Sequence, residues 1–149
     1  MNRKSQKEIQ VTTHMVRQFL QENEDTGYRV FHSNLLPGVD NVMGIRLPVL
    51  RKFAKQLSGM DWQEWFEQAD DQWYEETMLR GLVSAYAKMA VAWAVSVYFA
   101  AFPDEMLTYL QDGHKLDEFT YKKSLQKITE SYRVDKEMKK IIKEMRQRG

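Results

Sequence analysis

The sequence predicts an all-α fold built from short antiparallel helices. Val, Ile and Thr nowhere alternate with polar residues over the length of a strand, whereas apolar residues recur every three or four positions through most of the chain. The clusters of Gly, Pro, Asn and Asp between these stretches are short. Short helices joined by short loops form either an irregular bundle or a stack of degenerate HEAT-like helix pairs, and the sequence leaves both arrangements open.

The first half of the chain contains four expected helices. Pro48 suits the first turn of the third helix, Ser58 and Gly59 end it, and Asp61 with Glu64 resembles a capping box at the start of the fourth. A loop with the sequence LPGVDNVMG precedes the third helix. The expected helices span residues 5–22, 26–36, 47–57 and 62–69.

The second half begins with an unusually long apolar stretch that runs from residue 73 to residue 102. This stretch contains one Gly and no Pro, so it predicts a single helix longer than the usual 8–20 residues. Pro103 opens the next helix, which closes at Asp112 and Gly113, and two further helices are expected over 117–132 and 136–148. We therefore expect about eight helices in one domain, in which the long helix joins an N-terminal segment, residues 1–86, to a C-terminal segment, residues 87–149.

The composition is that of a soluble globular protein. Apolar residues make up 43% of the 149 residues and charged residues 29%. The first ten residues are polar, and no apolar run is both long and uncharged enough for insertion, so we expect neither a signal peptide nor a transmembrane span. Cysteine is absent, which excludes disulfides, thiolate metal sites and a Cys nucleophile. A reducing compartment, the cytoplasm, is the expected location.

Charge is unevenly distributed along the chain. Residues 1–118 carry 12 Lys and Arg against 17 Asp and Glu, a net charge of −5, whereas residues 119–149 carry 10 against 4, a net charge of +6. A basic end on a nearly neutral protein indicates an anionic partner. The alternative is a solvated, charge-rich terminal helix.

The stretch MGIRLPVLRKFAK, residues 43–55, is a candidate phosphate-binding segment. A turn containing Gly leads into a helix N-terminus, where unpaired backbone N–H groups attract anions. Four cations lie in or beside it, and two of them share one helix face: Arg46, Arg51, Lys52 and Lys55. An ordinary basic amphipathic helix would have the same pattern.

Other residue types give weaker signals. The three histidines lack metal-type spacing, and we expect neither a metal nor an organic cofactor. Four acidic residues, Asp70, Asp71, Glu75 and Glu76, cluster near the start of the long helix, where a capping role outweighs acid–base catalysis. Trp93 lies in an apolar run, so core packing is the default expectation, with an aromatic wall for a base as the alternative.

Three blocks of the sequence resemble the AlkD-like DNA alkylation repair family. The blocks are GYRVFHSNLLPGVDNVMGIRLPVLRKFAKQL (27–57), KMAVAWAVSVYFAAFPDEMLTYLQ (88–111) and FTYKKSLQKITESYRVDKEMKKIIKEMRQR (119–148), and YEETMLRGLV (74–83) adds to them. The resemblance implies a HEAT-like helical fold whose basic concave face holds duplex DNA. It also implies an ancestral activity, the excision of cationic N3- and N7-alkylpurines without the base flipping that most glycosylases use.

The resemblance also implies roles for individual residues. Tyr28 and Trp93 match family aromatics that face the DNA around the lesion, and Arg46 matches a polar position that faces the DNA. The expected DNA-backbone contacts are Arg51, Lys52, Lys55, Lys122, Lys123 and Lys127.

The chain departs from the family pattern in its centre. Family members carry further helices after the YEE helix, with a Trp-x-x-x-Asp motif whose Asp is the catalytic carboxylate, and these are missing here. The long helix therefore resembles two family helices fused near Tyr86–Lys88, either continuous or kinked at 85–88. Because a deletion of central repeats exposes apolar faces, we expect a homodimer, which could be domain-swapped through residues 74–102.

Three functions follow as hypotheses. The first is a DNA-binding protein whose glycosylase activity is weakened or lost. The second is a non-catalytic helical interaction scaffold, or a decayed remnant, that does not bind DNA. The third is a glycosylase that has recruited another carboxylate, from the acidic cluster or from a second subunit.

Overall fold

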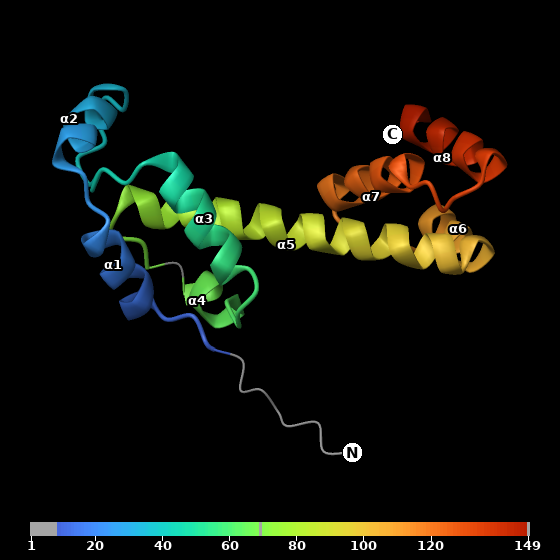
Figure 1. The fold of residues 1–149 in the computed structure, drawn as a ribbon, viewed down its shortest axis with the longest axis horizontal. Helices are drawn as coiled ribbons and strands as arrows, with labels where there is room; N and C mark the ends of the chain where they lie inside the picture. The colour runs from blue at the N-terminus through green and yellow to red at the C-terminus, as the bar shows by residue number, and fades with distance from the viewer. Residues whose placement is uncertain (1–8, 69, 149) are drawn as a thin grey trace, which may run out of the picture. The chain divides into compact units, whose positions relative to one another are not determined.

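A computed structural model describes residues 9–68 and 70–148, and within these ranges the chain is all-α, as predicted, with eight helices and no strand (Figure 1). The helices are α1 (Thr13–Glu22), α2 (Thr26–Asn34), α3 (Leu47–Leu57), α4 (Gln63–Gln68), α5 (Tyr74–Ala101), α6 (Pro103–Asp112), α7 (Glu118–Glu130) and α8 (Lys136–Arg148). They form two compact units, residues 1–86 and 87–149, each with its own hydrophobic core.

The core of the N-terminal unit lies between α1, α3, α4 and the first half of α5. Leu20, Leu50 and Leu79 are fully buried in it, and Trp65 is 1% exposed. The ring of Phe19 stacks on that of Phe53, with the centroids 3.6 Å apart. Because apolar residues on every one of these elements face this core, tertiary burial stabilises helices that would be marginal in isolation.

The start of the first helix differs most from the sequence-based prediction. The first helix begins at Thr13, because the side chain of Thr12 accepts a hydrogen bond from the Met15 N–H and so caps it. Residues 9–11 are instead extended, and Gln10 forms an isolated parallel bridge with Asp61. The rest of the predicted extension, 5–8, lies outside the described residues.

The predicted capping box at Asp61 is wrong. The backbone of Asp61 pairs with Ile9 and Val11, and the Glu64 carboxylate accepts hydrogen bonds from the side chains of Gln10 and Gln68. The short helix α4 starts at Gln63, two residues beyond Asp61. The pairing of Asp61 with residues 9–11, some fifty positions earlier in the chain, therefore replaces the predicted capping motif.

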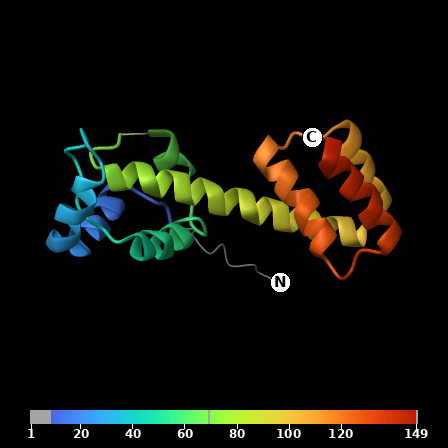
Figure 2. The same ribbon diagram turned by 90° about the horizontal axis from the view of Figure 1, so that it is seen from above.

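In the C-terminal unit, helices α6, α7 and α8 share a hydrophobic core with the second half of α5. Its core contains Phe99, Leu110, Leu125, Ile128 and Ile142, contributed by α5, α6, α7 and α8. Figures 1 and 2 show α7 and α8 side by side, running in opposite directions as a helix pair.

Asp117 caps α7 and links it to α5. Its carboxylate accepts hydrogen bonds from the backbone N–H and the hydroxyl of Thr120, and it forms an ion pair with Lys88 at 3.2 Å. The hydrogen bonds from Thr120, with Lys88 beside them, lower the pKa of Asp117 to about 2.

Helix α5 continues without a break across Ala85–Lys88, so the predicted single long helix is present. By length and composition alone this helix could cross a membrane, since an 18-residue window has a mean hydropathy of 1.4. Only 28% of that window is buried. Several of its residues belong to the two hydrophobic cores, including Val83, Val95 and Phe99.

Candidate functional site

The C-terminal unit contains a pocket of about 430 Å³ between the second half of α5 and the end of α7. Helix α5 supplies one wall, and the C-terminal end of α7 with the loop that leads to α8 supplies the other. The lining residues are Trp93, Ser96, Val97, Ala100, Lys127, Glu130, Ser131, Tyr132 and Arg133. The pocket thus combines an apolar floor with a rim of aromatic and charged side chains.

Trp93 lines this pocket from α5. Its side chain is 59% exposed, so core packing, the default expectation for a Trp in an apolar run, is wrong for this residue. The buried residues of this part of α5 are Ala92, Val95, Ser96 and Phe99, and of these Val95 and Phe99 belong to the hydrophobic core. A large exposed indole that no element of its unit covers is a surface to which a flat ligand can stack.

Lys127 lies next to Trp93. The Lys127 ammonium is 5.8 Å from the centroid of the indole ring, which is within the range of a cation–π interaction. Its ammonium also donates a hydrogen bond to the Glu130 carboxylate at 2.8 Å. Two of the residues singled out from the sequence, one aromatic and one basic, are therefore brought together in one pocket.

Glu130 is the carboxylate among the residues that line the pocket. Hydrogen bonds from Lys127 and, to a smaller extent, from Gln126 lower its pKa, so it is ionised at neutral pH. An ionised carboxylate beside an aromatic wall can stabilise a developing positive charge. The sequence analysis did not single out Glu130, because a Glu in a Lys-rich helix gives no signal of its own.

Tyr132 and Arg133 complete the rim, and the sequence analysis had not placed them in the site. Tyr132 is 86% exposed, and the Arg133 guanidinium lies 5.5 Å from the centroid of its ring. Both lie in the α7–α8 loop, where an exposed aromatic beside an arginine provides a second stacking surface with a positive charge.

Tyr28 and Arg46 lie together in the N-terminal unit. The Arg46 guanidinium is 5.2 Å from the centroid of the Tyr28 ring and forms an ion pair with Asp25 at 2.9 Å. Asp25 also accepts a hydrogen bond from the Tyr28 N–H, and this bond together with Arg46 lowers the pKa of Asp25. Arg46 is therefore partly neutralised by a neighbour that the sequence analysis had not paired with it.

The remaining predicted DNA contacts lie on α3 and α7. On α3 the side chains of Arg51, Lys52 and Lys55 are exposed, and among the described residues no carboxylate lies within ion-pair distance of them. On α7 Lys122 forms an ion pair with Glu118 at 2.8 Å, and Lys123 lies 5.9 Å from the ring centroid of Phe119.

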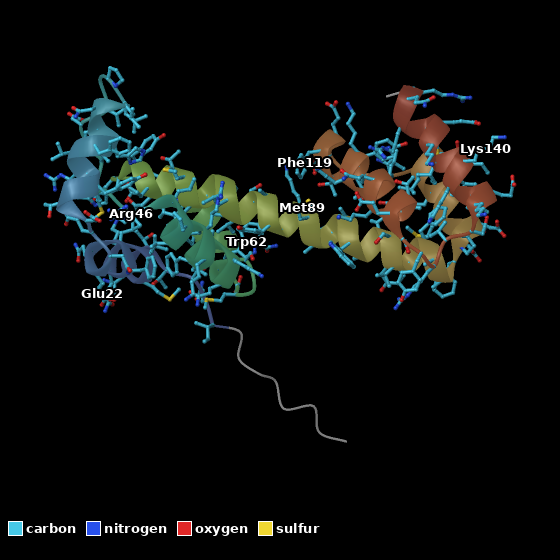
Figure 3. All side chains as sticks on the ribbon, turned by 45° about the horizontal axis from the view of Figure 1, so that its top comes forward. Glu22, Arg46, Trp62, Met89, Phe119 and Lys140 are labelled. Atoms are coloured by element: carbon cyan, nitrogen blue, oxygen red, sulfur yellow. The ribbon has the colours of Figure 1, made fainter. Side chains whose placement is uncertain are left out.

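Helix α8 and the loop before it carry most of the basic end. Figure 3 shows Lys140 on α8. Its buried side is formed by Ile142 with Met138 and Met145. The basic side chains of this region that are exposed are Arg133, Lys136, Lys140, Lys143, Arg146 and Arg148. Exposed acids lie among them, Asp135, Glu137 and Glu144, so this region has a net positive charge rather than a uniformly basic surface.

The acidic cluster at the start of α5 is structural. Glu75 is fully buried and accepts hydrogen bonds from the backbone N–H groups of Met43, Gly44 and Ile45. Glu76 is equally buried and accepts from the N–H groups just before α5 and from Arg17.

The two aspartates of the cluster are also engaged. Asp71 forms an ion pair with Arg80 at 2.6 Å and accepts a hydrogen bond from the Thr77 hydroxyl, while Asp70 lies 3.8 Å from the Arg17 guanidinium. The fixed hydrogen bonds of the two buried glutamates make these two residues poor sources of a recruited catalytic carboxylate.

Two of the three histidines pack against aromatic rings. His32 contacts the rings of Tyr28 and Tyr74, and His114 stacks on Tyr121 at 4.2 Å. In the described portion of the chain no three His, Cys, Asp or Glu side chains are grouped in a way that could hold a metal ion.

Comparison of the chain with family models, curated proteins and solved structures gives no match. The fold and the pocket therefore define a class only: an all-α helical-repeat protein with an aromatic and basic pocket in its C-terminal unit.

Proposed function

We propose that this protein binds duplex DNA through its basic C-terminal unit and that Trp93 packs against the DNA at the lesion. The observation that carries the proposal is the placement of an exposed Trp93 beside Lys127 in a pocket rimmed by Arg133. The resemblance of residues 27–57, 74–83, 88–111 and 119–148 to the alkylation repair family supports it.

The chemistry of the pocket suits a nucleic acid better than a small apolar ligand. A base that is unstacked at a lesion offers a flat π-face to an indole, and stacking of this kind contributes about 1–3 kcal/mol per base. Cations beside the indole attract the phosphates on either side of that base. The exposed basic side chains of α8 extend the same positive charge beyond the pocket.

We propose that this protein has lost, or retains only weakly, the ancestral activity of excising cationic N3- and N7-alkylpurines. The segment that would carry the family carboxylate is missing from the sequence. Loss of a comparable electrostatic group costs roughly 2.7–4 kcal/mol of transition-state stabilisation, a factor of about 100 to 1,000 in rate. Release of very labile 7-alkylguanine is the activity that would survive such a loss best, because its cationic base is already a good leaving group.

If base release above the spontaneous rate is detected, Glu130 is the first candidate for the catalytic carboxylate. This carboxylate is ionised and lies in the same pocket as Trp93, whereas the buried glutamates of the acidic cluster are occupied by backbone N–H groups. Glu130→Gln keeps the shape of the side chain and removes its charge. Base release that this substitution abolishes would assign the carboxylate to Glu130.

The test combines two measurements on methylated duplex DNA. Release of 7-methylguanine and 3-methyladenine is measured beside a salt titration of binding to the same DNA. Binding that weakens steeply with salt and base release at the spontaneous rate is the expected result. The absence of both binding and release would contradict the proposal.

A matched pair of variants separates stacking from general damage. Trp93→Ala removes the indole from the pocket, and Tyr109→Ala removes another exposed aromatic, on α6, that does not line it. We expect Trp93→Ala to weaken binding about 5- to 150-fold and Tyr109→Ala to leave it unchanged. Equal effects of the two substitutions would exclude a specific role of Trp93.

The second candidate function is a non-catalytic helical scaffold without affinity for DNA. The exposed apolar side chains of α5 outside the pocket favour it, since such surfaces mark interactions between proteins. The salt titration distinguishes the two functions. A cytoplasmic location is proposed for either, in keeping with the absence of cysteine from the sequence.

A further inference from the structure

We infer that the second half of α5 pairs with the same segment of a second copy, in an antiparallel helix pair. The surface concerned, which we call the α5 outer face, consists of Ala90, Val91, Ala94, Tyr98, Ala101 and Phe102. It lies outside the pocket, whose lining on α5 is Trp93, Ser96, Val97 and Ala100. The inference is therefore independent of the proposed DNA binding.

The α5 outer face is exposed and carries no charge. Val91 is 44% exposed, Tyr98 59% and Phe102 54%, and the three alanines are exposed as well. No charged residue occurs between Met89 and Phe102. A solvated helix face normally carries polar side chains, whereas a contiguous apolar patch of several hundred Å² marks an interaction site.

The spacing of these residues is that of a helix contact. Val91, Ala94, Tyr98 and Ala101 follow one another at intervals of three, four and three, which keeps them in one row along the helix. The same row begins in the first half of α5 with Leu79 and Val83, which are fully buried in the N-terminal core. The row continues beyond that core, but within the C-terminal unit none of the described residues covers it.

The row is complementary to itself when two copies run in opposite directions. A two-fold axis beside Ala94 places Val91 of one copy opposite Tyr98 of the other, and Ala87 opposite Ala101. Small residues at and around the axis allow the two helices to approach to about 8 Å, and large side chains then fill the space on either side. Such an isologous contact is the one that closes a dimer.

The area of the face sets the strength of the contact. A whole aromatic side chain has a surface of about 200 Å², and Val and Ala have less. The exposed parts of the six side chains of the face therefore add up to roughly 400 Å² per copy, or about 800 Å² in the pair. Specific, stable interfaces bury about 1,200–2,000 Å², so the pair is a weak dimer that depends on concentration. The absence of charge favours a second copy over a strongly basic or acidic partner, which would leave its own charges unpaired.

Sedimentation of the whole chain between about 1 and 200 µM tests the inference. The wild type should change from monomer to dimer within this range, and Ala94→Glu, which places two like charges at the axis, should remain monomeric. Ala85→Glu is the matched control, because Ala85 is an exposed residue of α5 outside the row. A wild type that stays monomeric, or a dimer that survives Ala94→Glu, would overturn the inference.

Site-specific crosslinking gives an independent measurement, because the natural chain has no cysteine. With a short bis-maleimide we expect Ala94→Cys to crosslink to itself and Ala85→Cys to remain uncrosslinked. A mixture of Val91→Cys and Tyr98→Cys chains should form the mixed species, whereas self-crosslinking of each alone would indicate parallel pairing. A monomeric wild type whose binding to neutral phospholipid vesicles is lost in Ala94→Glu would assign the face to a lipid surface and contradict the dimer.

Discussion

Glu75 accepts a hydrogen bond from the backbone N–H of Gly44 at 2.8 Å, across 31 positions of the sequence. The carboxylate also accepts from the N–H groups of Met43 and Ile45, so one buried side chain satisfies three consecutive backbone donors. The loop before α3 is thereby fixed to the first turn of α5. This loop and the start of α3 contain Arg46 and the cations that the sequence suggests as phosphate contacts.

Substitution of Glu75 should destabilise the N-terminal unit. Glu75→Ala leaves three buried N–H groups without an acceptor, and we expect a loss of about 3–5 kcal/mol in the free energy of unfolding. Glu75→Gln keeps one acceptor oxygen and should lose about 1–3 kcal/mol. Urea unfolding followed by fluorescence measures both, with the exposed Glu67→Ala as control. A loss below about 1 kcal/mol for Glu75→Ala would show that the loop is held by other contacts.

Gly44 should not tolerate a side chain. Its φ is +90°, and a Cβ atom would collide with the backbone and Cβ of Arg29. Gly44→Ala therefore combines backbone strain, about 1–3 kcal/mol, with a steric clash. Gly38 is the matched control, because its φ is +82° but the space around it is open. Thermal unfolding should show a clearly larger loss for Gly44→Ala than for Gly38→Ala.

Asp117 should make the stability of the C-terminal unit depend on pH. Its pKa is about 2 in the folded protein, below the ordinary value of 3.8 for an aspartate. A lowered folded-state pKa contributes stability that is present above the unfolded-state pKa and is lost as the pH falls through the folded-state pKa. The loss should occur between about pH 4 and pH 2.

The comparison of wild type with Asp117→Asn isolates this effect. Asn still caps a helix but does not titrate in this range. Urea midpoints at pH 5, 4, 3 and 2 should therefore fall less steeply for Asp117→Asn than for the wild type. Parallel curves for the two proteins would indicate that other carboxylates, such as Glu118 and Glu130, determine the acid response.

Neutralisation of α8 should change the salt dependence of DNA binding without changing preference for a base. Lys140→Gln with Lys143→Gln removes two exposed charges. If both contact phosphates, the slope of log K against log salt should decrease in magnitude by about 1.8. Lys115→Gln removes an exposed charge outside the pocket and serves as control. An unchanged slope in the double variant would show that α8 does not contact the DNA.

The helices could be predicted from the sequence, because their apolar residues have a consistent spacing and Pro or Gly marks several ends. The structure agrees closely for α3, α6 and α8, with Pro48 and Pro103 in the first turns of their helices. The errors arose where a distant segment competed with a local motif. Asp61 pairs with residues 9–11 instead of capping α4, and the same pairing holds residues 9–11 outside α1.

The site was less predictable for a physical reason. The spacing of α5 shows that one row of residues is apolar, but it does not show which rows another element covers. Trp93 and Val95 lie in the same run, yet Trp93 is 59% exposed and Val95 8%. The residues of the α7–α8 loop, Tyr132 and Arg133, follow no pattern that would place them near α5.

The distribution of tryptophan gives each unit a distinct optical signal. Trp62, Trp65 and Trp73 belong to the N-terminal unit, where Trp65 is 1% exposed, while Trp93 is the single indole of the C-terminal unit and faces solvent. Emission from Trp65 should be shifted to the blue and should report the unfolding of its own core. Emission from Trp93 should be at longer wavelength and respond to quenchers. A Trp93→Phe chain would therefore show tryptophan emission only from the N-terminal unit, and the difference spectrum would record the tryptophan signal of the pocket.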